Sequence, residues 1–182
     1  MSLAVATAAR SNCRKRAVGA IITSERRIIA AGYNGTIMGF TNCFDGGCPR
    51  CNSDAPSGTL LDQCICVHAE QNALLSAAQL NNGVKGGECW VTTEPCLDCT
   101  KSLIQAKVAS TYYLQPYPLT GGSQTLRDDM RRHALDKRDI HFTLWQPDSD
   151  VLKLNDQIKE INERLAAYVA AHAPPITTGG QP

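Results

Sequence analysis

The hydrophobic and polar positions of this chain follow a helical or a strand period over most of its length, but one central stretch follows neither. The alanine-rich residues 3–12 predict a first helix. Apolar runs at 17–23 and 28–33, separated by a polar turn, predict a β-hairpin. In residues 34–63 glycine, proline, asparagine, aspartate and cysteine dominate. A loop this long in a compact domain is usually functional or held in place by additional bonds.

Beyond residue 66 the pattern alternates between helices and strands. It predicts helices over 67–80, 95–104, 125–134 and 152–171, and strands over 89–92, 110–114 and 140–144. In the first of these helices the predicted core-facing stripe is Val67, Leu74, Leu75 and Ala78. In the last helix Leu154, Ile158, Ile161 and Leu165 share one face, and residues 172–182 are expected to be a disordered tail.

This order of elements predicts the α/β class. We expect a three-layer α-β-α sandwich with a mixed five-stranded sheet. A single domain would cover residues 1–171, with an insertion around 36–66.

The composition is that of an ordinary water-soluble protein, with 43% hydrophobic and 19% charged residues. No apolar run approaches the roughly 18 residues that a membrane helix needs, so no membrane partner is expected. The first ten residues lack a basic segment before their apolar stretch, which makes them a poor secretory signal and predicts a cytoplasmic location.

The formal net charge is only +1, so the chain has no overall positive field for a nucleic acid. This balance favours a small anionic substrate. The local run Arg14-Lys15-Arg16 could bind one phosphate group, although a solvated turn explains it equally well.

Two short motifs carry the candidate chemistry. They are His68-Ala69-Glu70 and Pro95-Cys96-Leu97-Asp98-Cys99. His68, Cys96 and Cys99 supply one nitrogen and two sulfur ligands, which matches a catalytic zinc with a fourth position left for water. A lone Cys-x-x-Cys is often structural, but both motifs fall at predicted helix starts. The combination is the pattern of the zinc deaminases that act on nucleobases.

Glu70 is the predicted proton carrier. Two thiolates cancel the charge of a zinc ion and weaken it as a Lewis acid, so a carboxylate base should help. We expect Glu70 to take a proton from the attacking water, pass it to the ring nitrogen of the base, and then protonate the leaving amine.

The other cysteines form a second group. The chain has nine cysteines, too many to be explained by the catalytic motif, and a disulfide framework is not expected without export. Cys89 lies on a predicted strand and is expected to be a core thiol. The remaining six form a pool for a structural zinc: Cys13, Cys43, Cys48, Cys51, Cys64 and Cys66. Cys43, Cys48, Cys51 and Cys66 are the favoured set, and a two-metal cluster remains open.

On these motifs the chain resembles the cytidine deaminase superfamily, and within it the deoxycytidylate (dCMP) deaminases. The matching stretches are 18–22, 32–35, 68–74 and 92–99, and the similarity runs from about residue 11 to 117. The resemblance implies zinc-dependent deamination of dCMP to dUMP, which supplies thymidylate synthesis. It assigns zinc binding to His68, Cys96 and Cys99, and proton transfer to Glu70. It places Asn34 at the nucleotide, with Arg16 and Tyr117 as candidates by position. Some phage-type relatives carry a second zinc near positions resembling Cys13 and Cys43.

The resemblance also implies regulation and assembly. Many dCMP deaminases are homohexamers that respond to dCTP and dTTP, in some cases with magnesium accompanying the nucleotide effector. The corresponding loop covers residues 33–43, where Ile37 replaces the usual proline. Three alternatives stay open: a deaminase of another modified cytosine or purine nucleotide, a tRNA- or DNA-editing deaminase, and a zinc-stabilised binding module. A binding module would give Glu70 no role. The riboflavin-pathway deaminases have a longer interval around the second cysteine pair, which this chain lacks.

Overall fold

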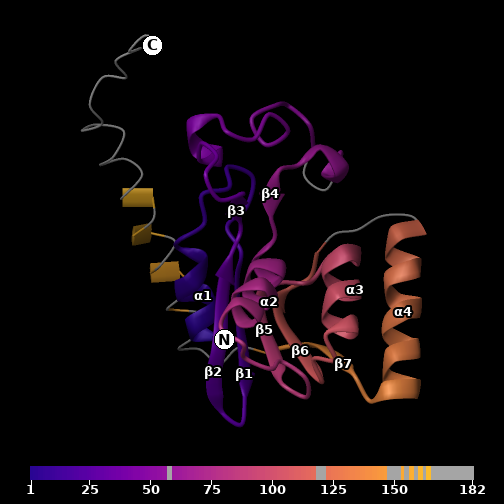
Figure 1. Ribbon diagram of the computed structural model, residues 1–182. Coiled ribbons are helices and arrows are strands. Elements are labelled where there is room, and N and C mark those ends of the chain that lie inside the picture. The colour runs from indigo at the N-terminus through magenta and orange to yellow at the C-terminus, as the bar shows by residue number, and fades with distance from the viewer. Residues whose placement is uncertain are drawn as a thin grey trace.

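A computed structural model describes residues 1–56, 59–117 and 122–146 of the chain (Figure 1). It also describes seven helical positions further on: Lys153, Asp156, Gln157, Glu160, Ile161, Glu163 and Arg164. The face expected for a closing helix, apart from the exposed Ile161, and the expected tail lie outside the described residues. Within the described residues no helix combines the length and the apolar character needed to cross a bilayer.

Five strands form one mixed sheet, as predicted. They are β1 (Gly19–Ser24), β2 (Arg27–Tyr33), β5 (Glu88–Thr93), β6 (Ser110–Gln115) and β7 (His141–Leu144), in the order β2-β1-β5-β6-β7. The expected hairpin is present, because β1 pairs antiparallel with β2, and β1 is also antiparallel to β5. The pairs β5–β6 and β6–β7 are parallel. The crossover connections between parallel strands are helical, as parallel pairing usually requires.

Two glycines show that helices cover both faces of this sheet. A Cβ on Gly19 would lie 2.1 Å from the carbonyl oxygen of Ala4 in α1 (Ser2–Ala8), and a Cβ on Gly32 would lie 2.2 Å from that of Ala69 in α2 (Ala69–Gln79). Gly32 pairs with Ala20, so Gly19 points to the opposite face. The predicted three-layer α-β-α arrangement is therefore confirmed.

The buried face of α2 differs from the predicted stripe. Ala69, Ala73 and Ala77 are fully buried, whereas Leu75 is 56% exposed and Ala78 is also exposed. The prediction was wrong for Leu75 and Ala78, because the helix backbone lies against Gly32 and only small side chains fit at that distance, whereas Leu74 packs against the core as predicted. Val67, which was assigned to the same helix, belongs to a short strand instead.

Two other helices end at residues that differ from the expectation. The first helix stops at Ala8, not at residue 12, because the Ser11 hydroxyl turns to donate hydrogen bonds to Asn34. Helix α3 (Leu97–Gln105) lies close to its predicted position, while α4 (Gly122–Arg138) is longer than predicted at both ends. The apolar period of α4 is weak because it directs arginines, not aliphatic side chains, toward its neighbours.

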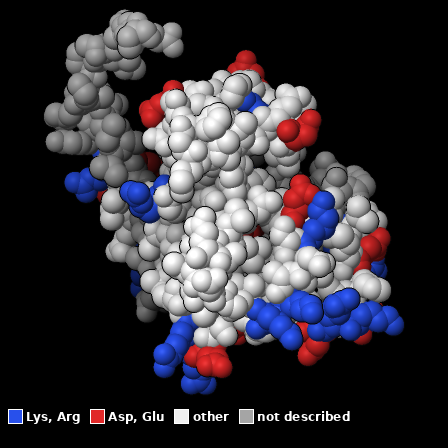
Figure 2. Space-filling view, in the orientation of Figure 1, with Lys and Arg blue, Asp and Glu red and all other residues white. Residues whose placement is uncertain are grey.

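The central stretch forms a lobe beyond one end of the sheet (Figure 1). It contains two short strands, β3 (Gly35–Thr36) and β4 (Cys66–Val67), which pair with each other, and two 3-10 turns, η1 (Cys43–Asp45) and η2 (Leu61–Gln63). The lobe buries Arg50 and several cysteines, and the cysteines form a cluster separate from the aliphatic core. Lysines and arginines gather at the opposite end of the molecule on the face seen in Figure 2.

Candidate active site

The two sequence motifs meet at the starts of two helices. His68 is the N-cap residue of α2, Cys96 is the N-cap residue of α3, and Cys99 lies in the first turn of α3. The Nδ1 atom of His68 lies 3.4 Å from the Sγ atoms of both Cys96 and Cys99. Ligands about 2.0 and 2.3 Å from a tetrahedral zinc would be about 3.5 Å apart, so this triad fits a zinc ion.

The environment of the triad favours thiolate at Cys96, while the same hydrogen bond and burial raise the pKa of the Cys99 thiol. A hydrogen bond from Cys99, assisted by His68, lowers the pKa of the Cys96 thiol to about 4. Both cysteines also lie at the N-terminal end of α3, where the helix dipole stabilises negative charge. Two sulfurs and one imidazole that are fixed by helix starts provide a pre-formed three-ligand site.

Glu70 lies in the first turn of α2 and is only 4% exposed. Burial, together with the negative charge of Cys96, raises the pKa of its carboxyl to about 7. A carboxyl with such a pKa can both accept and release a proton near neutral pH, which is the property a proton carrier needs.

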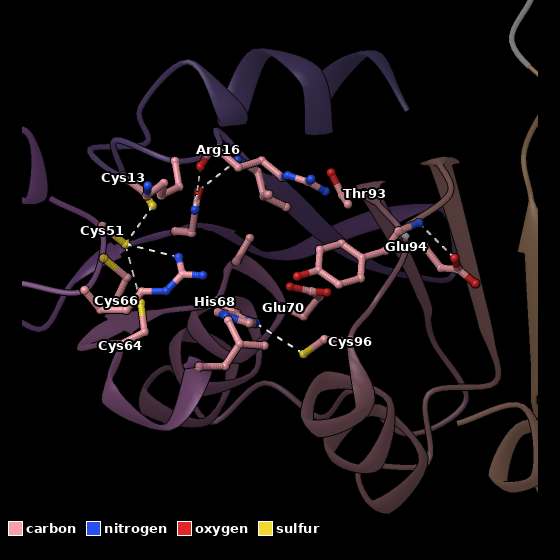
Figure 3. A pocket seen from close by; sticks show the side chains of 17 residues that line it. Cys13, Arg16, Cys51, Cys64, Cys66, His68, Glu70, Thr93, Glu94 and Cys96 are labelled. Atoms are coloured by element: carbon pink, nitrogen blue, oxygen red, sulfur yellow. Dashed lines mark hydrogen bonds between the residues drawn. The ribbon is translucent and has the colours of Figure 1, made fainter. Parts of the chain in front are cut away.

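A pocket lined by His68, Glu70 and Cys96 connects this site to the lobe. Figure 3 shows His68, Glu70 and Cys96 on one side of the pocket and Cys13, Cys51, Cys64 and Cys66 on the other. The predicted residues Asn34, Arg16 and Tyr117 also line it.

Asn34 fixes the wall of the pocket through its side chain. Its Oδ1 atom accepts hydrogen bonds from the Ser11 hydroxyl at 2.7 Å and the Val18 amide at 2.8 Å, and its Nδ2 atom donates to the Arg16 carbonyl at 2.7 Å. The side-chain amide has a second N–H, which is available to a ligand in the pocket.

The basic run divides into two parts. Lys15 and Arg16 line the pocket, but Arg14 does not. The Arg16 guanidinium lies over the Tyr117 ring, with 4.9 Å between the guanidinium carbon and the ring centroid. Lys15 donates a hydrogen bond to the Ser53 carbonyl at 2.9 Å. Two cations that line the pocket make a suitable environment for an anionic group.

Two side chains of this region were not found from the sequence. Arg50 lies between the cysteines of Cys48-Pro49-Arg50-Cys51, lines the pocket and is only 6% exposed. Glu94 precedes the Pro95-Cys96 motif, is 8% exposed and receives ion pairs from Arg127 and Arg131 of α4. Arg50 could have been found from the sequence, because it lies inside a Cys-x-x-Cys motif. The partners of Glu94 could not, because nothing in the sequence links Glu94 to helix α4.

The six remaining predicted ligands are brought together in the lobe. Their Sγ atoms form two groups, Cys13, Cys43, Cys51 and Cys66, and Cys48, Cys51, Cys64 and Cys66, with all atoms of a group within 4.8 Å of one another. Cys43 and Cys48, which the favoured set combined, fall in different groups. Cys89 is separate from them and buried in the aliphatic core.

Residues 1–115 match the family model described as the cytidine and deoxycytidylate deaminase zinc-binding region. The chain belongs to this family. The matched residues include all of the triad and Glu70, as well as the six-cysteine group.

Members of the family that resemble this chain include two yeast proteins. The deoxycytidylate deaminase of Saccharomyces cerevisiae is 48% identical over 117 residues, and that of Schizosaccharomyces pombe is 43% identical over 126 residues. These matches cover 64% and 69% of this chain, but only 36% and 39% of the yeast proteins. The chain therefore corresponds to little more than a third of these curated relatives.

A solved structure of the family has a similar fold. The dCMP deaminase of cyanophage S-TIM5, crystallised in complex with dCMP and dUMP, is 31% identical and superposes with a TM-score of 0.57. The superposition covers 79% of this chain and 91% of the phage protein.

Proposed function

We propose that this chain is the catalytic domain of a zinc-dependent dCMP deaminase, which hydrolyses dCMP to dUMP and releases ammonia. One observation carries the proposal: His68, Cys96 and Cys99 meet beside the buried Glu70, and His68, Cys96 and Glu70 line a pocket that Lys15 and Arg16 also line. Three ligands and an adjacent carboxyl suit hydrolysis, and the cations suit a nucleoside monophosphate. The yeast and phage relatives named as dCMP deaminases support the choice of substrate.

The reaction assigns a separate task to each side chain. When bound to His68, Cys96 and Cys99, zinc would lower the pKa of a water molecule and so supply the nucleophile. Glu70 accepts the proton of that water and donates it to the ring nitrogen beside the amino-bearing carbon. After water has attacked this carbon, Glu70 takes the second proton from the new hydroxyl group and transfers it to the amino group, the C–N bond breaks as the C=O bond forms, and ammonia leaves. Burial of Glu70 keeps both proton transfers away from bulk solvent.

The phosphate-binding role falls to the far end of the pocket. Arg16 and Lys15 are its cationic donors, Tyr117 holds the Arg16 guanidinium by stacking, and Asn34 offers its free N–H to the sugar or base. This division would select a monophosphate over the free nucleoside, because two cations would otherwise remain without an anionic partner.

Assembly and regulation are further parts of the proposal. The exposed apolar side chains Ile37, Met38 and Phe40 lie in the loop expected to bind effectors, and the exposed Phe44 follows it; exposed apolar side chains of this kind suit an interface between subunits. We propose a homo-oligomer in which this loop meets a second copy and responds to dCTP and dTTP, and a role in supplying dUMP to thymidylate synthesis. We also propose one deaminase domain whose insertion around residues 36–66 is held by metal bound to cysteines.

A screen for ammonia release tests the substrate. The purified protein would be assayed with dCMP, CMP, deoxycytidine, dCTP, methylated cytosine monophosphates and purine monophosphates, each with and without dCTP or dTTP. We expect the highest kcat/KM with dCMP and little turnover of deoxycytidine. A purine monophosphate or a tRNA as the best substrate would contradict the proposal.

A further inference from the structure

The six cysteines of the lobe have a geometry that one metal ion does not explain. The two groups of four Sγ atoms share Cys51 and Cys66, and each group has two further sulfurs of its own. Cys13 and Cys43 belong to one group, and Cys48 and Cys64 to the other. Eight ligand positions are thus filled by six residues.

The distances fit tetrahedral coordination in both groups. Cys13 Sγ lies 3.8 Å from Cys51 Sγ in the first group, while Cys64 Sγ lies 3.8 Å from Cys48 Sγ and 3.6 Å from Cys51 Sγ in the second. Sulfur ligands about 2.3 Å from a tetrahedral zinc would be about 3.8 Å apart. Sulfurs this close leave room for a bare ion but not for the inorganic sulfide of an iron–sulfur cluster.

The burial of the cysteines argues against a single metal ion in the lobe. Cys43 and Cys48 are each fully buried, and Cys51 is 2% exposed. An ion in the first group alone would leave Cys48 and Cys64 as thiols against two metal-bound thiolates, and an ion in the second group would do the same to Cys13 and Cys43. Filling both groups uses every sulfur.

The charges around the cluster also fit two ions. Six thiolates and two divalent cations carry a net charge of −2, whereas two separate four-thiolate sites would carry −4. The Arg50 guanidinium lies 4.0 Å from Cys51 Sγ through Nη1, and the backbone amide of Arg14 donates to Cys43 Sγ at 3.4 Å. A buried cation and an oriented amide provide local compensation for the remaining negative charge.

We propose that the lobe holds two zinc ions in one cluster, in which Cys51 and Cys66 bridge both ions, Cys13 and Cys43 complete one coordination shell, and Cys48 and Cys64 complete the other. The cluster goes beyond the catalytic metal and does not depend on which nucleotide is the substrate. It also has a role in the pocket. Cys13 is followed by Lys15 and Arg16, Cys51 is preceded by Arg50, and Cys66 lies two residues before His68. The cluster therefore fixes the cationic end of the pocket relative to the catalytic triad (Figure 3).

Metal analysis of the purified chain tests the number of ions. We expect about three zinc ions per chain, one catalytic and two in the cluster. His68→Ala is the control for the catalytic site and should leave about two. The double variants Cys13→Ser/Cys43→Ser and Cys48→Ser/Cys64→Ser should each lose about one zinc relative to the native chain. If the lobe held one ion, the native chain would contain about two, and one double variant would keep its full content while the other lost its lobe metal.

A spectroscopic measurement tests the bridges without any variant that could misfold. The native protein would be loaded with cadmium-113 and studied by NMR. Two resonances in the four-thiolate region that are coupled to each other through shared sulfurs would support the cluster. A single four-thiolate resonance, two uncoupled ones, or iron with acid-labile sulfide in the purified protein would overturn it. The His68→Ala protein should lose deaminase activity but retain the two coupled resonances. That result would separate this proposal from the catalytic one.

Discussion

The Nη1 atom of Arg131 lies 2.6 Å from the Oε1 atom of Glu94, in a part of the protein where both side chains are largely buried. The other carboxylate oxygen of Glu94 accepts a hydrogen bond from the Tyr117 amide at 2.9 Å. Arg131 also donates to the Pro95 carbonyl at 3.2 Å and lies over the Phe142 ring. This pair therefore ties α4 to the residues just before Cys96 and to the pocket wall at Tyr117.

Glu94→Gln should destabilise the protein strongly. The substitution keeps the shape of the side chain but leaves Arg127 and Arg131 buried without their anion, which typically costs about 3–5 kcal/mol. Asp129→Asn is the matched control, because Asp129 pairs with Arg132 on the exposed side of the same helix and should change stability by less than about 1 kcal/mol. The free energy of unfolding, measured by urea denaturation, checks both. Equal effects of the two variants would refute the role of Glu94.

Gly32→Ala should loosen the contact that places the catalytic helix. The new Cβ would lie 2.2 Å from the backbone carbonyl of Ala69, so α2 would have to move, together with His68 and Glu70 at its start. We expect a loss of about 1–3 kcal/mol or more in stability and a lower kcat.

Gly83→Ala is the control for this change, since a Cβ there meets no atom within 4 Å. It should leave thermal stability and kcat near the native values. Normal stability and activity of Gly32→Ala would show that the helix can shift without affecting the site.

Arg16→Ala should weaken binding of the phosphate. A charge-assisted hydrogen bond contributes about 1.5–3 kcal/mol, so KM for dCMP should rise by roughly 10- to 100-fold. Arg14→Ala is the control from the same basic run, because the Arg14 side chain lies outside the pocket and only its backbone amide contacts Cys43. Steady-state kinetics distinguish the two variants. An unchanged KM for Arg16→Ala would remove Arg16 from the phosphate site.

The sequence predicted the order of the sheet elements and the catalytic motifs well because both are local signals. Strand runs and a Cys-x-x-Cys at a helix start are visible in a short window, as β5 and Cys96 illustrate. The buried face of α2 was wrong because it depends on how closely Gly32 approaches the helix, a distance set by tertiary packing.

Long-range polar contacts also could not be predicted from local sequence patterns. Arg127 and Arg131 look like solvated helix residues in sequence, yet they surround Glu94, which lies 33 and 37 positions away. The grouping of the six cysteines could not be chosen from spacing, because the two shared sulfurs belong to Cys51 and Cys66, which are 15 positions apart and lie in different short motifs. A cluster of these cysteines was predictable, but its division into two groups was not.

Glu70→Gln, assayed for zinc content and ammonia release from dCMP, tests the central claim most directly. Glutamine has nearly the same shape but cannot carry the proton, so the variant should retain zinc at His68, Cys96 and Cys99 and lose roughly 10²- to 10⁴-fold in kcat. A variant that contains the catalytic zinc and still deaminates dCMP within a few-fold of the native rate would contradict the account.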